Sequence, residues 1–254
     1  MSKVTFFAIR KKLKKNIFKI INMLILPVHM KNGFLKRYGL IILFFIVFSV
    51  VGVSSFNYVQ TPAKKLPIYS PSMVSDELVE ENLRYVKKYH RISDFSLLNQ
   101  NGENVTQNDY KNKIYVADFF FTTCPDICPI MTGNMVYLQE KLKESDVMLA
   151  SFSVTPEVDT VEVLKSYSLE KGVDDSKWNL MTGEKKQIYD LARKSFLVAK
   201  KIHNEKNHGM IHTENFVLVD KEKRIRGYYD GTNKDEMIKL LDDIKILIDS
   251  YESS

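Results

Sequence analysis

Residues 113–135 read KIYVADFFFTTCPDICPIMTGNM, and the only two cysteines of the chain divide this stretch into two halves. Residues 113–121 are almost continuously apolar and rich in β-branched and aromatic side chains, which predicts a strand buried on both faces. From residue 127 to residue 143, apolar residues recur at helical spacing, which predicts an amphipathic helix. Cysteines at the end of a central strand, opening a helix, are typical of a thioredoxin-like α/β domain, because reactive groups collect at such strand ends.

The rest of the chain continues to alternate between strand and helix patterns. Asn101–Gly102 lies between two short apolar stretches, which is a hairpin signal. A helix opened by Asp159 or Thr160 is predicted through Leu169. Further strands are expected at 147–154, 178–182, 216–219 and 224–229, and further helices at 184–196 and 235–251. This pattern predicts one thioredoxin-like domain over residues 91–254.

Charge is divided unevenly along the sequence. Residues 1–75 contain twelve Lys or Arg and no Asp or Glu, whereas residues 76–254 contain 25 basic and 31 acidic residues, a net charge of −6. A nucleic-acid-binding domain normally carries a clustered basic face. The acidic balance of the predicted domain therefore argues against a nucleic-acid partner.

The basic N-terminal region precedes a candidate transmembrane anchor. Residues 39–59 are uncharged and include LIILFFIVFSVVGV (40–53), so the stretch is long enough to span a bilayer. Basic residues stay on the cytoplasmic side, which predicts a cytoplasmic segment 1–38. The domain is then expected on the periplasmic side of the cell inner membrane, held by a single-pass anchor.

A cleaved signal peptide is the alternative, with Ser54 and Ser55 as candidate cleavage residues. An uncleaved anchor is preferred because a signal core typically has about 7–15 apolar residues. Met30 is an alternative start, in which case residues 1–29 would not be translated. Residues 60–90 hold three closely spaced prolines and predict an extended tether, followed by a lead-in helix at 76–90.

Cys124 and Cys128 are separated by three residues at the predicted start of a helix, a position that lowers the pKa of a thiol. A disulfide is sterically permitted, but so small a loop would constrain the unfolded chain little, so a purely structural role is disfavoured. Thiol–disulfide exchange motifs usually have two intervening residues. The wider spacing favours two thiolates on one soft ion such as Cu(I), and a nitrogen ligand would let the site hold Cu(II). Zinc is less suited, because a closed zinc site normally has four protein ligands.

A third ligand must come from one of five histidines. His29 precedes the anchor and His90 precedes the first strand of the domain, whereas His203, His208 and His212 lie in or near the loop before the strand at 216–219. In this fold that strand lies beside the cysteine loop, and His212 is nearest to it. Thiol–disulfide oxidoreductases of this fold keep a cis-proline facing their cysteines. No proline follows residue 156, which leaves that position open to a side chain such as His212.

Four blocks of sequence resemble the Sco (SenC) family of copper chaperones. They occur in the family's order, over about residues 92–248: FFFTTCPDICP (119–129), SVTPEVDTVEVLKSY (153–167), WNLMTG (178–183) and HTENFVLVD (212–220).

The resemblance implies that Cys124, Cys128 and His212 bind one copper ion, as Cu(I), Cu(II) or both. It also implies delivery of copper to the dinuclear centre of cytochrome c oxidase subunit II, or to another copper or dithiol protein, without turnover of its own. Reduction of the target's cysteines is an expected part of that task.

The sequence departs from the family pattern at two positions, with Thr155 and Ile211 where the family often has Asp. An acidic neighbour can orient a liganding imidazole, so these departures bear on copper affinity and target preference. Glu157, Asp159 and Glu214 are candidate substitutes, although we expect them to be solvated surface charges. Asp126 is interpreted either as a partner contact or as a helix-start carboxylate.

Two other functions compete with copper delivery. The first is a membrane-anchored thiol–disulfide oxidoreductase that acts through Cys124 and Cys128 without metal. The second is a peroxidase of the same fold superclass. Such enzymes usually place Thr three residues before the reactive cysteine, where this chain has Phe121, so the peroxidase is disfavoured.

Overall fold

The computed structural model describes residues 33–60, 65–75, 77–79, 84–86, 90–199 and 213–252. They belong to two compact units, Met1–Lys64 and Lys65–Ser254. The first unit contains helix α2 (Gly33–Gln60), whose apolar side chains are exposed, including Leu40 and Phe48. By length and composition, its Arg37–Ser54 stretch can cross a membrane. The predicted apolar helix is thus confirmed as a candidate anchor.

The second unit is built on a mixed sheet, in which seven strands of the described residues follow the order β2-β1-β5-β4-β3-β6-β7. β3, β4 and β5 are parallel, while β1, β2, β6 and β7 pair antiparallel with their neighbours. The strands are β1 (Ser96–Asn99), β2 (Asn104–Thr106), β3 (Tyr115–Phe120), β4 (Met148–Ser153), β5 (Trp178–Thr182), β6 (Asn215–Val219) and β7 (Ile225–Asp230).

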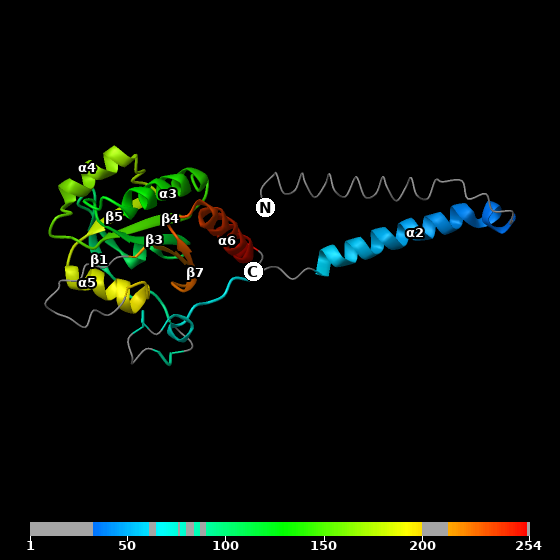
Figure 1. The fold of residues 1–254 in the computed structure, drawn as a ribbon, viewed down its shortest axis with the longest axis horizontal. Coiled ribbons are helices and arrows are strands. Elements are labelled where there is room, and N and C mark those ends of the chain that lie inside the picture. Colours follow the sequence, from blue (N-terminus) through cyan, green and yellow to red (C-terminus); the bar gives the residue numbers. More distant parts are fainter. Residues whose placement is uncertain are drawn as a thin grey trace. The chain divides into compact units, whose positions relative to one another are not determined.

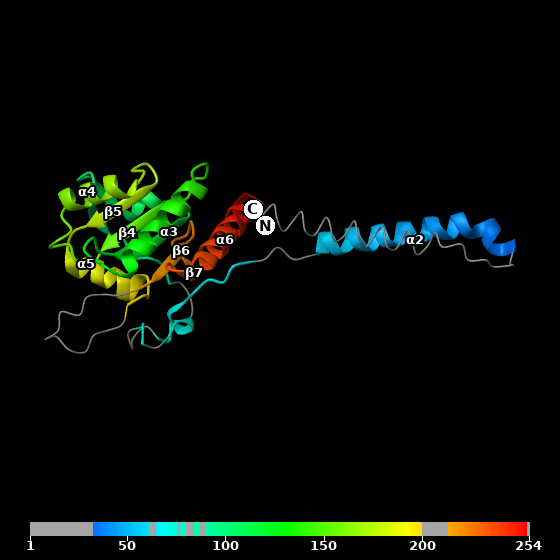
Figure 2. The same cartoon turned by 45° about the horizontal axis from the view of Figure 1, so that its top comes forward.

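Helices cover both faces of this sheet (Figures 1 and 2). The helices of the domain are α3 (Ile127–Lys141), α4 (Val161–Lys171), α5 (Lys185–Asp190) and α6 (Lys234–Glu252). Phe120 lies against Tyr167 of α4, whereas Phe119, the next residue back along β3, packs on Phe196 after α5. Successive residues of a strand point to opposite faces, so α4 and the segment after α5 cover opposite sides of the sheet.

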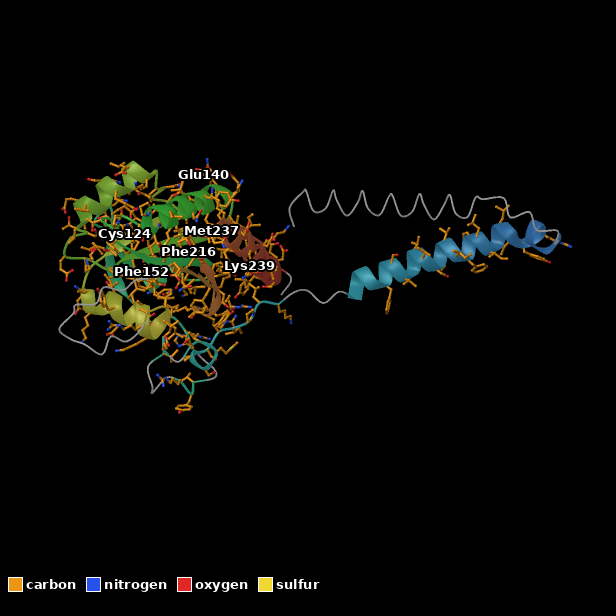
Figure 3. All side chains as sticks on the ribbon, viewed as in Figure 1. Cys124, Glu140, Phe152, Phe216, Met237 and Lys239 are labelled. Carbon is orange, nitrogen blue, oxygen red and sulfur yellow. The ribbon has the colours of Figure 1, made fainter. Side chains whose placement is uncertain are left out.

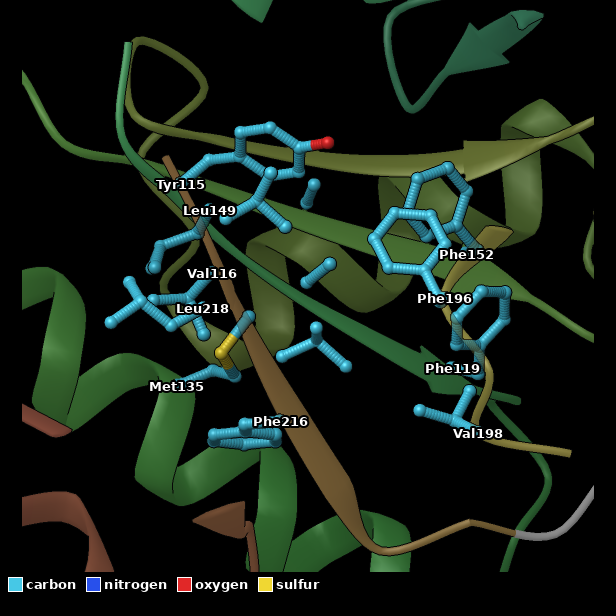
Figure 4. Close-up of a cluster of buried hydrophobic side chains, with 14 of the residues drawn as sticks. Tyr115, Val116, Phe119, Met135, Leu149, Phe152, Phe196, Val198, Phe216 and Leu218 are labelled. Carbon is cyan, nitrogen blue, oxygen red and sulfur yellow. The ribbon is translucent and has the colours of Figure 1, made fainter. Parts of the chain in front are cut away.

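Every residue of β3 is buried, as predicted for a central strand with helices on both sides. The aromatic part of the core lies on the α5 face, where Phe152 is fully buried between the rings of Phe95, Phe119 and Phe196 (Figure 4). On the opposite face, α3 contributes Met135, which has no exposed surface.

The predicted strands, hairpins and helices of the domain are confirmed, with three refinements. Thr160, not Asp159, caps α4 by accepting a hydrogen bond from the backbone N–H of Val163. The helix predicted at 184–196 changes to π-helical geometry over Leu191–Ser195. Of the predicted lead-in helix at 76–90, the described residues 77–79 and 84–86 form turns and a bend, and the other positions except residue 90 lie outside the described residues.

The proline-containing segment before the domain lies against the edge strand β7. The backbone N–H of Tyr69 donates to the carbonyl of Ile225 at 2.9 Å, and the Tyr69 ring packs edge-on against Tyr228. Arg226 donates to the carbonyls of Leu66 and Pro67. The chain from residue 65 is therefore part of the folded unit, and it protects the backbone of an otherwise open sheet edge.

The aromatic core predicts a large stability cost for one substitution. Phe152→Ala should lower the free energy of unfolding by about 3–5 kcal/mol, because it removes a fully buried ring and leaves a cavity. Leu169→Ala is the control, since Leu169 is 72% exposed on α4 and its loss should change stability by less than about 0.5 kcal/mol. Urea unfolding followed by the fluorescence of Trp178, the only tryptophan, measures both. Equal effects of the two substitutions would contradict this description of the core.

Candidate metal centre

The two cysteines lie where β3 ends and α3 begins. Cys124 is in the connecting loop and is labelled in Figure 3, and Cys128 lies in the first turn of α3. Both are free thiols and both are largely buried, with 9% of Cys124 and 4% of Cys128 exposed. The predicted position of the dithiol, at the carboxyl end of a central strand, is therefore confirmed.

The first turn of α3 directs its backbone toward the sulfur of Cys124. Burial disfavours the thiolate, but hydrogen bonds from the backbone N–H groups of Asp126, Ile127 and Cys128, and from the Cys128 thiol, outweigh it and lower the pKa of Cys124. These amides are among those that a helix start leaves without intrahelical partners. Cys124 is thus the cysteine prepared to act as a thiolate, either toward a metal or toward a disulfide.

Cys128 has the opposite character. Desolvation by burial raises the pKa of Cys128 to about 12, and the hydrogen bond to Cys124 and the charges of Cys124 and Asp118 act in the same direction. A thiol with so high a pKa gives up its proton only when something stabilises the anion, such as a bound cation. The pair therefore combines one thiol whose pKa is lowered with one thiol whose pKa is raised.

Asp118 is a buried carboxyl group in β3, on the face covered by α3 and α4, and it was not among the site residues predicted from the sequence. Burial raises the pKa of Asp118 to about 7, against a lowering effect of the hydrogen bond that the Ser151 hydroxyl donates to it. Trp178 in turn donates to the Ser151 hydroxyl at 2.8 Å. An acidic residue inside an otherwise apolar strand was the available signal, because a carboxylate is rarely buried without partners.

Asp159 was expected to be a solvated surface charge, and that prediction is wrong. Its side chain has no exposed surface and accepts hydrogen bonds from the Thr122 and Ser153 hydroxyls, each at 2.5 Å, and from the Thr155 hydroxyl at 3.1 Å. Enough hydroxyl donors converge on it to make burial of a carboxylate tolerable. The spacing Ser-Val-Thr-Pro-Glu-Val-Asp could have indicated this, since it returns Asp159 toward two hydroxyls of its own loop.

The other acidic candidates lie at the surface. Glu157 forms an exposed ion pair with Lys185 at 2.9 Å, and Glu214 is exposed. Asp126 is exposed and precedes α3 without a side-chain capping bond, so its backbone, not its carboxylate, contributes to the site. None of these three carboxylates has a described contact with the cysteines.

The histidines divide into one that the structure describes and several that it does not. The ring nitrogen Nε2 of His90 donates to the carbonyl of Ser195 at 2.7 Å, so His90 is engaged away from the cysteines. His29, His203, His208 and His212 lie outside the described residues, as does Ile211. Within the described ranges, no group of three or more His, Cys, Asp or Glu side chains could hold a metal ion.

The two sulfurs, although they are the only candidate ligands brought together among the described residues, fit a soft metal ion better than a hard one. The donors are two free thiols four residues apart, and no carboxylate oxygen completes the set among the described residues. Thiolates select copper(I) or zinc over magnesium, calcium or manganese. The described half of the site is therefore consistent with copper.

Comparison with known proteins identifies the family of this chain. The family model SCO1/SenC matches residues 84–249. The chain belongs to the SCO1/SenC family. A SCO1 protein homolog of Bacillus subtilis is 34% identical over 160 residues, which cover 61% of this chain and 82% of that protein.

Solved structures of Sco proteins share the thioredoxin-like fold. A SCO1/SenC family lipoprotein from Bacillus anthracis is 34% identical with a TM-score of 0.57, covering 63% of this chain and 95% of that one. BsSco, a member of the Sco family of cytochrome c oxidase assembly proteins in which a disulfide switch was identified, is 34% identical with a TM-score of 0.55, covering 62% and 93%. Arabidopsis thaliana ScoI, solved with copper bound, is 28% identical with a TM-score of 0.49, covering 60% and 97%.

The opposite pKa shifts of the two cysteines predict unequal reactivity in this Sco protein. With each cysteine alone, Cys124 in the Cys128→Ser variant should react with iodoacetamide at pH 7 at least about tenfold faster than Cys128 in the Cys124→Ser variant. The rate for Cys124 should also reach half its maximum at a lower pH, because its pKa is lowered while that of Cys128 is raised. Mass spectrometry of alkylated protein measures both profiles. Equal rates and equal midpoints would refute the asymmetry.

Proposed function

We propose that this Sco protein binds one copper ion as cargo through Cys124, Cys128 and His212, and delivers it during assembly of the dinuclear copper centre of cytochrome c oxidase. The observation that carries the proposal is the position of two free, buried thiols four residues apart, where β3 ends and α3 begins. Two thiols one helical turn apart are suitable donors for one soft cation.

The charges of the dithiol favour a cation between the sulfurs. The lowered pKa of Cys124 favours its thiolate, and Cys128 would exchange its proton for the ion. Two thiolates suit Cu(I), and an added imidazole would let the same site hold Cu(II).

The placement of β6 supports His212 as the third ligand. His212 lies three residues before Asn215, where β6 begins. β6 runs antiparallel to β3, with Val217 opposite Ala117, so it starts at the end of the sheet where β3 leads into the cysteine loop. A loop that enters β6 can therefore bring an imidazole toward the sulfurs.

The family supplies the argument for the recipient. BsSco is described as one of the cytochrome c oxidase assembly proteins, and it carries a disulfide switch. We infer that subunit II of the oxidase, with its dinuclear copper centre, is the partner, and that reduction of its cysteines accompanies copper transfer.

Metal binding by full-length protein tests the three ligands. Wild-type protein should bind about one copper per chain, and Cys124→Ser or Cys128→Ser should abolish tight binding. His212→Ala should weaken copper affinity by about 100-fold or more while the Cys124–Cys128 disulfide still forms. Competition with a chromogenic copper chelator measures affinity, and absorption spectroscopy reports sulfur coordination.

His208→Ala is the matched control, because it removes an imidazole from the same segment of sequence and should leave copper affinity unchanged. Unchanged affinity in His212→Ala, or an equal loss in His208→Ala, would contradict the ligand set.

A thiol–disulfide oxidoreductase without metal is the second candidate. The lowered pKa of Cys124 beside the raised pKa of Cys128 favours it, since exchange enzymes use one attacking and one resolving thiol. Catalysed reduction of a dithiol substrate by protein that binds no copper would establish this function instead.

We also propose that α2 is an uncleaved single-pass anchor in the inner membrane, with the domain on the periplasmic side. Helix α2 is long and apolar enough to cross a membrane, basic residues precede it, and a Bacillus anthracis relative is a lipoprotein. A lipid on a cysteine is excluded near α2, because the cysteines of this chain are at positions 124 and 128.

Cell fractionation tests the anchor. The full chain should pellet with membranes and resist extraction by salt or alkali, because about 20 apolar residues lie in the bilayer. A protease added to intact spheroplasts should digest residues 65–254 and spare the N-terminal segment. A mature protein whose mass places its first residue near Ser54 or Ser55 would show a cleaved signal peptide instead.

A further inference from the structure

The carboxylate of Asp159 joins the loop that carries Cys124 to the loop that follows β4. Its Oδ1 accepts from the Thr122 hydroxyl, and its Oδ2 accepts from the Thr122 backbone N–H at 3.3 Å and from the hydroxyls of Ser153 and Thr155. We call these four residues the Asp159 cluster. Thr122 supplies two of the contacts, and it lies two residues before Cys124.

The two loops of the cluster leave the sheet side by side. β3 and β4 are parallel and end in register, with Phe120 opposite Ser153, and the backbone N–H of Val154 donates to the carbonyl of Phe120 at 2.9 Å. Beyond that bond, the loop after β3 and the loop after β4 are joined by the hydrogen bonds of Thr122 to Asp159. The buried side chain of Asp159 thereby holds the loop that carries Cys124 to the core of the domain.

The two cysteines are positioned by different means. Cys128 belongs to α3, which is fixed by Met131, Met135 and Leu138, all without exposed surface. Cys124 lies outside the helix, so its distance from Cys128 depends on the path of the loop from Phe121 to Cys124. Hydrogen bonds to a carboxylate are about twice as strong as those between neutral groups, and the burial of Asp159 excludes competing water.

We propose that Asp159 is a positioning residue for the dithiol: by holding Thr122 it keeps Cys124 beside Cys128 and favours formation of their disulfide. The inference rests on the proposed reactivity of the two cysteines but requires no copper. Asp159 touches neither sulfur, so its effect passes through the backbone of the cysteine loop.

The equilibrium of the two cysteines with glutathione disulfide measures how strongly the fold favours their disulfide. The Cys124 thiolate attacks one sulfur of glutathione disulfide and releases a glutathione thiolate. Cys128 then attacks the Cys124 sulfur and releases the second glutathione, and the protons of the two cysteine thiols end on the two glutathione thiolates. The equilibrium constant rises with the effective concentration of one cysteine near the other, which a fixed loop increases.

The experiment measures this constant for full-length protein in detergent, equilibrated in glutathione buffers, quenched with acid, alkylated and weighed by mass spectrometry. Thr122→Val should lower the constant about tenfold, which is about 30 mV for a two-electron couple. Thr122→Ser keeps the hydroxyl and should match wild type within about twofold. In Asp159→Asn, the side-chain N–H₂ would face hydroxyl groups that donate hydrogen bonds to the carboxylate in the wild type. This substitution should therefore lower the constant at least as far as Thr122→Val.

Thr132→Val is the matched control. Thr132 is buried in α3, one turn after Cys128, and its hydroxyl lies 2.7 Å from that of Tyr167 in α4, a partner outside the loop from Phe121 to Cys124. The same chemical change there should cost stability without moving the disulfide equilibrium. Urea unfolding of each variant confirms that it is folded, and if Asp159→Asn does not fold, the two Thr122 variants decide the question.

The outcomes separate this inference from copper delivery. A Thr122→Val constant within twofold of wild type, or an equal shift in Thr132→Val, overturns the positioning role even if copper binds. A tenfold loss that Thr122→Ser restores supports the role even if the protein binds no copper.

Discussion

Six consecutive residue pairs join β3 to β4 in parallel, from Tyr115 opposite Met148 to Phe120 opposite Ser153. Parallel strands in register end together, so the cysteine loop after β3 and the loop after β4 leave the sheet as neighbours. The dithiol lies in the first loop and Asp159 in the second. β6 runs antiparallel to β3 and begins at this same edge. Every group assigned to the site depends on that shared edge, which the completely buried β3 stabilises by filling the centre of the core.

The surroundings of the two cysteines give their thiols different pKa values, a difference that the sequence alone does not show. The backbone at the start of α3 converges on Cys124 and lowers its thiol pKa, while burial and the neighbouring negative charges raise that of Cys128. The same difference in pKa serves both proposed activities of the pair. Binding of a soft cation and formation of a disulfide each start with the thiolate of the more acidic cysteine. The proposed copper chemistry and the proposed thiol chemistry would therefore use the same two sulfurs.

Two buried carboxyl groups near the dithiol have different surroundings. Asp118 receives one hydroxyl, and its pKa is raised to about 7 by burial. Asp159 receives three hydroxyls and a backbone amide and links two loops. Thr155 is one of the donors to Asp159.

Much of the fold could be predicted from local patterns. Burial and backbone preference act over a few neighbouring residues, so a local pattern can predict the element it forms. This holds for the apolar stretch 113–121, the helical spacing after Cys128, the turn at Asn101–Gly102 and the uncharged run 40–53. The pair Cys124 and Cys128 could be identified for the same reason, since one strand end and one helix start hold both.

Contacts between distant segments are a different matter, and only the tertiary structure decided them. The sequence places Asp159 37 residues after Thr122 and does not indicate that these two side chains meet. It likewise gives no sign that His90 is bound to Ser195, or that the proline-containing segment lies along β7. A side chain's burial depends on what the rest of the chain brings to it, and that becomes determined only when the strands take their order in the sheet.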